Sequence, residues 1–189
     1  MRRLLALLFV AGLTAGCAAP VATTPGAAPI TPASLPATDR SPAAQDAAEL
    51  PAPEDVPRSL QFTGTTLDGA AYNAAALAGK PAILWFWAPW CATCAGEAQS
   101  IADLADEYKG QIGILGIAGL GKNSEMHEFV SDLDVDAVPH LDDEAGKIWK
   151  RFKITQQSWY VFIDRTGKVV RIGYLDDLQL TEQVKTLVA

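Results

Sequence analysis

Apolar residues form short runs from about residue 59 onward. Residues 82–88 and 112–118 are nearly continuous apolar stretches, as is typical of strands covered on both faces of a sheet. Residues 159–163 and 168–172 predict two more strands, joined by a glycine-containing turn. A brief alternation at 60–62 predicts a first strand ahead of them.

Between these runs, apolar residues recur at helical spacing. Residues 92–109 predict a long helix that Gly110 ends, and residues 143–152 predict a short one. Two further helices are indicated by apolar sets at i, i+3, i+4 and i+7 or a similar spacing: Met126, Phe129, Val130 and Leu133, then Leu180, Val184, Leu187 and Val188. Alternating strands and helices followed by a hairpin predict one α/β domain with a mixed central sheet, covering residues 58–189.

The first seventeen residues differ from this pattern. Arg2 and Arg3 precede a short apolar stretch and a few small residues, and Cys17 follows at once. This arrangement resembles a bacterial lipoprotein signal, in which the cysteine is acylated and becomes the mature N-terminus. A plain secretory signal with an incidental cysteine is the alternative. A lipid on Cys17 would hold the protein at a membrane surface rather than across it.

Residues 18–57 form a third region, rich in Ala, Pro and Thr. Nine of the twelve prolines lie here and large apolar residues are almost absent, so the segment cannot bury enough surface to offset its conformational entropy. We expect a disordered, semi-rigid tether between the lipid and the domain.

The net charge is −7, and basic residues do not cluster. This acidic balance argues against nucleic acid as a partner.

Two of the three cysteines stand at Cys91 and Cys94, where a strand gives way to a helix. The free N–H groups and the positive dipole end of that helix favour a thiolate at Cys91. We therefore predict that Cys91 is exposed and attacks, and that Cys94 resolves the mixed disulfide. Trp90 is expected to form part of the surrounding surface.

Three other interpretations of the cysteine pair compete with redox chemistry. A zinc site needs further ligands, and only Cys17, His127 and His140 are obvious candidates, none at a ligand spacing. A structural disulfide would close a very small loop and contribute little through chain entropy. A pair of buried apolar cysteines conflicts with the position of Cys91 at a helix start.

The stretches GKPAILWFWAPWCATCAGEA (79–98) and ITQQSWYVFIDRTGKVV (154–170) resemble the extracytoplasmic TlpA/ResA/DsbE branch of the thioredoxin-like proteins. The resemblance implies a three-layer α/β fold with helices on both faces of the sheet. It also implies a thiol–disulfide oxidoreductase outside the cytoplasm, with no dissociable cofactor and no metal. Its partners would be protein thiols or disulfides and a protein that recycles the dithiol.

The resemblance also assigns roles. Cys91 takes the nucleophile position, Cys94 the resolving one, and Trp90 matches the family tryptophan beside them. Glu97 matches an acidic residue that follows the second cysteine, and from one turn further along it could accept a proton from Cys94. The alternative for Glu97 is a glutamate on a solvated helix face.

Ser158 departs from the family pattern, because relatives usually carry a cis-proline there, facing the disulfide. The residue before that proline pairs with substrate, which makes Gln157 and Ser158 candidate substrate contacts. A cis peptide before serine would cost roughly 3 kcal/mol, so we expect a trans bond and a differently shaped loop.

The export signal and the resemblance together imply an enzyme of the cell envelope, at the outer face of the plasma membrane, that oxidises secreted proteins. A reductase serving cytochrome c maturation is the close alternative. A non-catalytic binding module or metal carrier of thioredoxin-like shape is the alternative from another class.

Overall fold

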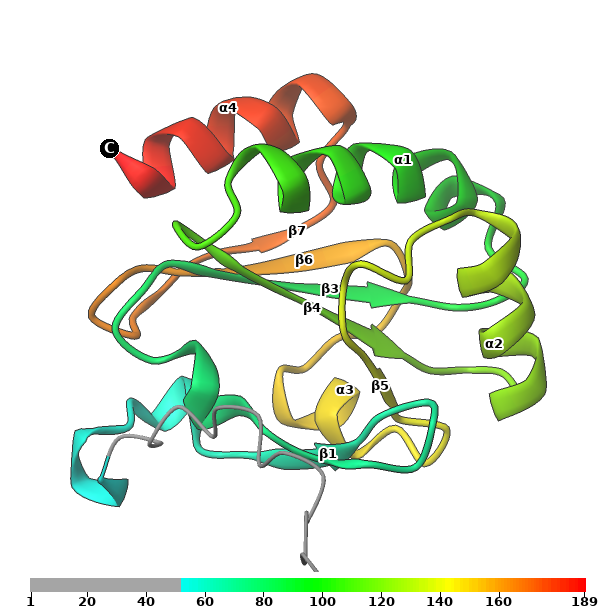
Figure 1. Cartoon of the computed structure of the whole chain (residues 1–189), viewed down its shortest axis with the longest axis horizontal. Coiled ribbons are helices and arrows are strands. Elements are labelled where there is room, and N and C mark those ends of the chain that lie inside the picture. The colour runs from blue at the N-terminus through cyan, green and yellow to red at the C-terminus, as the bar shows by residue number, and fades with distance from the viewer. Residues whose placement is uncertain (1–51) are drawn as a thin grey trace, which may run out of the picture. The chain divides into compact units, whose positions relative to one another are not determined.

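The computed structural model describes residues 52–189. Its centre is a five-stranded sheet in the order β5-β4-β3-β6-β7 (Figure 1). The strands are β3 (Ala82–Trp87), β4 (Gly113–Ala118), β5 (His140–Asp142), β6 (Trp159–Ile163) and β7 (Val169–Gly173). β3, β4 and β5 run parallel, while β6 is antiparallel to both β3 and β7. The predicted mixed sheet is confirmed.

Helices cover both faces of this sheet. α1 (Ala92–Glu107), α2 (Asn123–Asp132) and α4 (Asp177–Val188) contribute buried side chains to one core cluster. α3 (Lys147–Arg151) and the N-terminal segments contribute to the cluster on the opposite face (Figure 1). This is the predicted three-layer, thioredoxin-like architecture.

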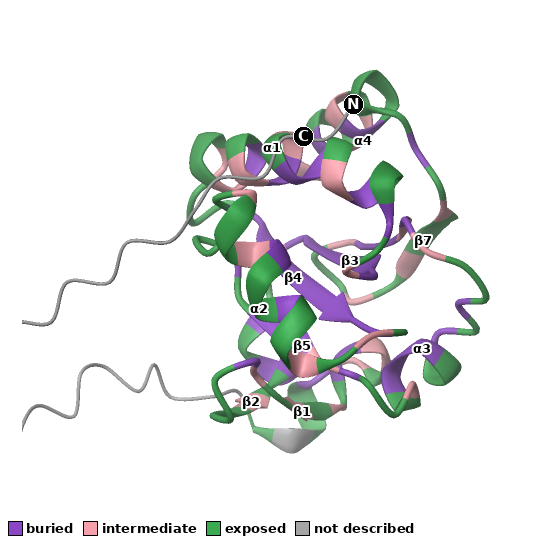
Figure 2. Cartoon of the chain, turned by 90° about the vertical axis from the view of Figure 1, so that its right-hand side faces the viewer, coloured by how far each residue is buried: buried purple, intermediate pink, exposed green. Residues whose placement is uncertain are grey.

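The two clusters explain why β3 is apolar at every position. Ile83, Trp85 and Trp87 point toward α1, and Leu84 and Phe86 point toward α3. All six residues of β3 are buried, as are those of β4 beside it (Figure 2). A strand buried on both faces needs no polar positions, so its sequence reads as one continuous apolar run.

Two parts of the N-terminal region correct the sequence prediction. The strand expected at 60–62 is absent there, because local i→i+3 hydrogen bonds form a 3₁₀ turn over Arg58–Leu60. A separate two-stranded hairpin follows instead, β1 (Thr63–Thr65) with β2 (Ala71–Asn73), and leads into a second 3₁₀ turn at Ala74–Leu77. Short elements like these, and β5, offer too few residues for a recognisable period.

The folded part begins before the predicted boundary at residue 58. Val56 is buried in the core beneath β3, and Pro57 packs so closely on Gly167 that no side chain would fit there. The last residues assigned to the tether therefore belong to the domain. The predictions for 1–17, including Cys17, and for 18–51 lie outside the described residues. No helix between residues 52 and 189 is long and apolar enough to cross a membrane.

Candidate active site

The turn between β3 and α1 carries both cysteines. β3 ends at Trp87, and α1 begins at Ala92 with Cys91 as its N-cap residue. The sulfur of Cys91 accepts a hydrogen bond from the backbone N–H of Cys94 across 3.0 Å. The two residues form a disulfide with their Cα atoms 5.2 Å apart. The predicted helix start at the first cysteine is confirmed, and the structure shows the oxidised form.

The prediction that Cys91 is exposed is wrong for the oxidised form, in which the residue is buried. Its relative exposure is 6%, and that of Cys94 is zero. Both side chains belong to the core cluster between the sheet and α1, since the bond to Cys94 directs the sulfur of Cys91 onto the first turn of the helix. Cys91 is still the more accessible of the two and thus the one that an incoming thiolate can reach.

The first turn of α1 holds no charged residue, either acidic or basic. The electrostatic influence on Cys91 after reduction therefore comes from the helix itself: the free N–H groups and the positive dipole end stabilise a thiolate there. The N–H of Cys94 already points at the sulfur in the oxidised form. No backbone movement is needed to supply that donor to a thiolate.

Trp90 stands next to the disulfide and is the most exposed tryptophan described, with a relative exposure of 61%. Its indole N–H donates to the backbone carbonyl of Leu120 across 2.6 Å. Leu120 has a φ of 56°, in the left-handed region, and is itself exposed. The glycine before Leu120 lies against Trp149 and the glycine after it lies against Pro89, and at neither position is there room for a Cβ. The Trp90 ring is therefore held at the surface by a tightly packed loop.

Glu97 lies on α1, and its relative exposure is only 4%. The alternative of a glutamate on a solvated helix face is therefore wrong. Burial raises the pKa of this carboxyl, and the negative charge of Asp177 adds to the rise. Polar hydrogens of Ser158, Tyr160 and Trp85 oppose it. Burial and the charge of Asp177 outweigh these donors, so the pKa of the Glu97 carboxyl lies above its ordinary value.

Ser158 is the link between Glu97 and the sheet. Its relative exposure is 1%, and its hydroxyl donates to Oε2 of Glu97 while accepting the indole N–H of Trp85 at 3.4 Å. Residues 52–189 contain no cis peptide bond, so the trans bond expected before Ser158 is confirmed. Its buried hydroxyl is not available to a substrate in this form. Gln157, half-buried in the bend before β6, remains the candidate contact.

Two residues near Glu97 were missed by sequence reasoning. Trp85 on β3 and Tyr160 on β6 are direct cross-strand partners, and both side chains lie on the face that α1 covers. Alternation along each strand indicates which face of the sheet a side chain occupies. The pairing of β3 with β6 is needed as well to show that Trp85 and Tyr160 meet beneath Glu97.

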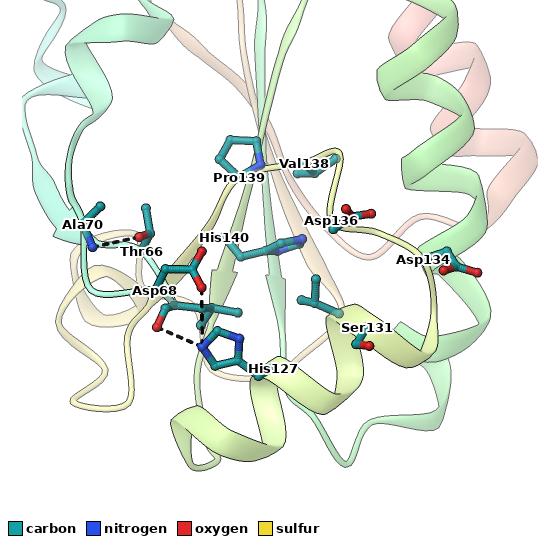
Figure 3. Close-up of a pocket in the computed structure, with 12 residues that line it drawn as sticks. Thr66, Asp68, Ala70, His127, Ser131, Asp134, Asp136, Val138, Pro139 and His140 are labelled. Atoms are coloured by element: carbon teal, nitrogen blue, oxygen red, sulfur yellow. Dashed lines mark hydrogen bonds and ion pairs between the residues drawn. The ribbon is translucent and has the colours of Figure 1, made fainter. Parts of the chain in front are cut away.

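A separate cavity of about 640 Å³ lies between the β1–β2 turn, α2 and the segment that leads into β5 (Figure 3). His127 lines it and contacts the carbonyl of Leu67 at 3.0 Å and the carboxylate of Asp68 at 4.0 Å. Neither cysteine lines this cavity. Among residues 52–189, no three His, Cys, Asp or Glu side chains gather closely enough to hold a metal ion.

A cysteine pair at the start of the long helix, above a mixed sheet covered on both faces, defines a thioredoxin-like protein. Residues 56–172 match the AhpC/TSA family, and the chain belongs to that family. The resemblance stated from the two sequence motifs is thereby confirmed.

Individual relatives are more specific. The chain is 41% identical over 108 residues to the soluble secreted antigen MPT53 of Mycobacterium tuberculosis, a match covering 57% of this chain and 61% of that protein. It is 29% identical over 132 residues to the thiol-disulfide oxidoreductase ResA of Oceanobacillus iheyensis, covering 63% and 68%.

Solved structures agree with the sequence matches. MTB dsbF, in mixed oxidised and reduced forms, is 41% identical with a TM-score of 0.66, covering 70% of this chain and 98% of that one. A secreted Mycobacterium tuberculosis disulfide oxidoreductase homologous to E. coli DsbE is 35% identical with a TM-score of 0.63, covering 68% and 98%.

Proposed function

We propose that the domain exchanges its Cys91–Cys94 disulfide with protein thiols as an extracytoplasmic oxidoreductase. The observation that carries this is the disulfide across the first turn of α1, with Cys91 at the N-cap and a backbone N–H directed at its sulfur. That position stabilises Cys91 as a leaving or attacking thiolate. Relatives named as secreted or as thiol–disulfide oxidoreductases support the assignment.

The reaction follows from the two sulfurs. A substrate thiolate attacks the sulfur of Cys91, forms a mixed disulfide and releases Cys94 as a thiolate. A second substrate thiolate then attacks the substrate sulfur, which leaves the substrate oxidised and Cys91 as a thiolate. For recycling, Cys91 attacks a protein disulfide of the recycling partner. Cys94 then loses its proton, attacks Cys91 and releases the partner's thiolate.

Glu97 is proposed as the acid–base group for Cys94. It lies one turn further along α1 and is buried, and burial raises the pKa of its carboxyl, which makes it a better proton acceptor. Glu97→Gln should slow formation of the disulfide from the reduced protein, because Cys94 then loses its proton to water alone. The measurement is the rate of oxidation by excess glutathione disulfide, followed by alkylation of the remaining thiols.

Substrate proteins are proposed to dock around Trp90 and the bend at Gln157. Trp90 offers an exposed aromatic face beside Cys91, and such side chains are frequent anchors at protein interfaces. Oxidation of secreted proteins is the proposed direction of exchange, with reduction in cytochrome c maturation as the alternative. The equilibrium potential against glutathione decides: a value near that of thioredoxin, about −270 mV, would support the reductase.

The N-terminal regions are proposed to place this domain at the outer face of the plasma membrane. Residues 1–17 would be the signal peptide, Cys17 the lipidated residue and 18–51 the tether, joined to the domain that begins near Val56. Labelling of the expressed full chain with a radioactive fatty acid tests this. Label that persists in Cys17→Ser would refute the anchor.

The catalytic proposal is tested with the full chain. The wild type should reactivate scrambled ribonuclease or reduce insulin, and Cys91→Ser should lose this activity completely. Cys17→Ser is the matched control, since it removes the third cysteine outside the described domain, and it should retain full turnover. Equal activity of the wild type and Cys91→Ser would support the non-catalytic binding module instead.

A further inference from the structure

The hydroxyl of Ser158 has both of its hydrogen-bonding functions in use. An indole N–H is only ever a donor, so the contact with Trp85 makes the serine oxygen an acceptor there. The single hydroxyl proton is therefore free to point at Oε2 of Glu97, to which it donates. All three side chains are buried. With Glu97 as a carboxylate, the serine hydroxyl is the donor to Oε2, so the chain runs from the indole through serine to the carboxyl.

The two oxygens of Glu97 differ as a result. Oε2 receives the serine proton, whereas Oε1 is buried without a hydrogen-bond partner. The hydroxyl oxygen of Tyr160 is also buried without a partner of good geometry, although it lies close enough to influence the carboxyl. While the serine proton is directed at Oε2, Oε1 is the carboxyl oxygen left without a hydrogen-bond partner and is available to take up a proton.

We propose that Ser158 is a positioning residue for disulfide exchange: it holds Oε2 of Glu97 so that the carboxyl gives and takes its proton at Oε1. This rests on the proposed role of Glu97. During recycling, the Cys94 thiol transfers its proton to Oε1, and its sulfur then attacks Cys91 and expels the thiolate of the partner protein. During substrate oxidation, Oε1 returns that proton to the Cys94 thiolate.

The titratable groups around Glu97 determine how a substitution of Ser158 affects its protonation. Tyr160 faces it from β6 and Asp177 from α4, and Cys94 lies one turn earlier on α1. Burial raises the pKa of the Tyr160 hydroxyl far above neutral pH, so that group stays protonated throughout. Ser158 lowers the pKa of Glu97, so its loss moves the protonation of Glu97 to higher pH.

The experiment measures oxidation of the reduced full chain by glutathione disulfide between pH 5 and 9, in the wild type, Ser158→Ala, Ser158→Thr and Glu97→Gln. In Ser158→Ala the rise of rate with pH should move to higher pH, and the rate at pH 7 should fall on the order of tenfold. Ser158→Thr keeps the hydroxyl and should restore the wild-type profile. Adding Ser158→Ala to Glu97→Gln should change nothing further.

The outcomes separate the two proposals. A shifted profile in Glu97→Gln with a wild-type profile in Ser158→Ala overturns the role of Ser158 and leaves that of Glu97 intact. An unchanged profile in Glu97→Gln removes the basis of both. If Ser158→Ala does not fold, neutron diffraction of the acid-soaked wild type decides. A deuteron on Oε1 supports the proposal, and one on Oε2 overturns it.

Discussion

The indole N–H of Trp87 donates to Nδ1 of His140 across 3.1 Å in the interior of the domain. Because indole nitrogen is only a donor, Nδ1 must be unprotonated and Nε2 carries the imidazole proton, which it donates to the carbonyl of Val135 at 3.1 Å. His140 is therefore a neutral imidazole at the edge of the cavity between α2 and β5 (Figure 3). It is the first residue of β5.

The first prediction concerns acid stability. Burial lowers the pKa of His140 to about 4, below its ordinary value of 6.5. Between these values the unfolded chain binds the proton more readily, so the free energy of unfolding falls as pH decreases from 6.5 to 4, by roughly 3 kcal/mol in total. Above pH 6.5 this contribution is fully present. Urea unfolding at several pH values measures the slope.

His140→Asn is the matched variant for that slope. The asparagine oxygen can accept the Trp87 proton but does not titrate, so the pH dependence between 6.5 and 4 should flatten. Glu97 contributes with the opposite sign, because a raised pKa favours the folded state below that pKa and the contribution is lost as pH rises. The difference in slope between the wild type and the variant therefore gives the contribution of His140 alone. An identical slope in both would contradict the assignment.

Gly116 determines whether the Trp87–His140 pair can form. A Cβ at this position would lie 2.0 Å from Nδ1 of His140 and 2.9 Å from Nε1 of Trp87. Gly116→Ala should therefore destabilise the domain by about 3 kcal/mol, since neither buried ring can move aside without losing its partner. Thermal unfolding with a van't Hoff analysis gives the value.

Gly96→Ala is the control for that substitution. Gly96 is exposed on α1, and a Cβ there meets nothing within 4 Å. Alanine in the interior of a helix is more favourable than glycine, so this variant should gain about 0.5–1 kcal/mol. Equal changes in stability for Gly116→Ala and Gly96→Ala would show that Gly116 is not needed to make room for the Trp87–His140 pair.

The acidic run 142–144 yields a third prediction. Asp143 is buried, and its carboxylate accepts the backbone N–H groups of Lys147, Ile148 and Trp149 at 2.8–2.9 Å. Asp143→Ala leaves these donors without a partner and should cost about 2 kcal/mol. Glu144→Ala removes only an exposed ion pair and should change stability by less than about 0.5 kcal/mol. Chemical denaturation of both variants compares them.

The sequence predicted the central sheet and its helices because buried strands and amphipathic helices carry their own periods. The site was predicted in part, since the positions of Cys91 and Cys94 follow from where a strand ends and a helix begins. The connection between Ser158 and Glu97 joins residues 61 positions apart, and no local pattern shows it. The burial of Asp143 is likewise not shown by the sequence, because a run of three acidic residues does not reveal which of them caps a short helix.

The last prediction concerns Trp90, whose ring is exposed while its N–H is held by Leu120. If the ring anchors protein substrates, Trp90→Ala should lower kcat/KM for a reduced protein substrate about tenfold and leave the reaction with glutathione unchanged. Leu178→Ala is the matched control, since Leu178 is an even more exposed apolar side chain, on α4, and the substitution should alter neither rate. A parallel loss with both substrates would mean instead that Trp90 supports the disulfide itself and not the docked protein.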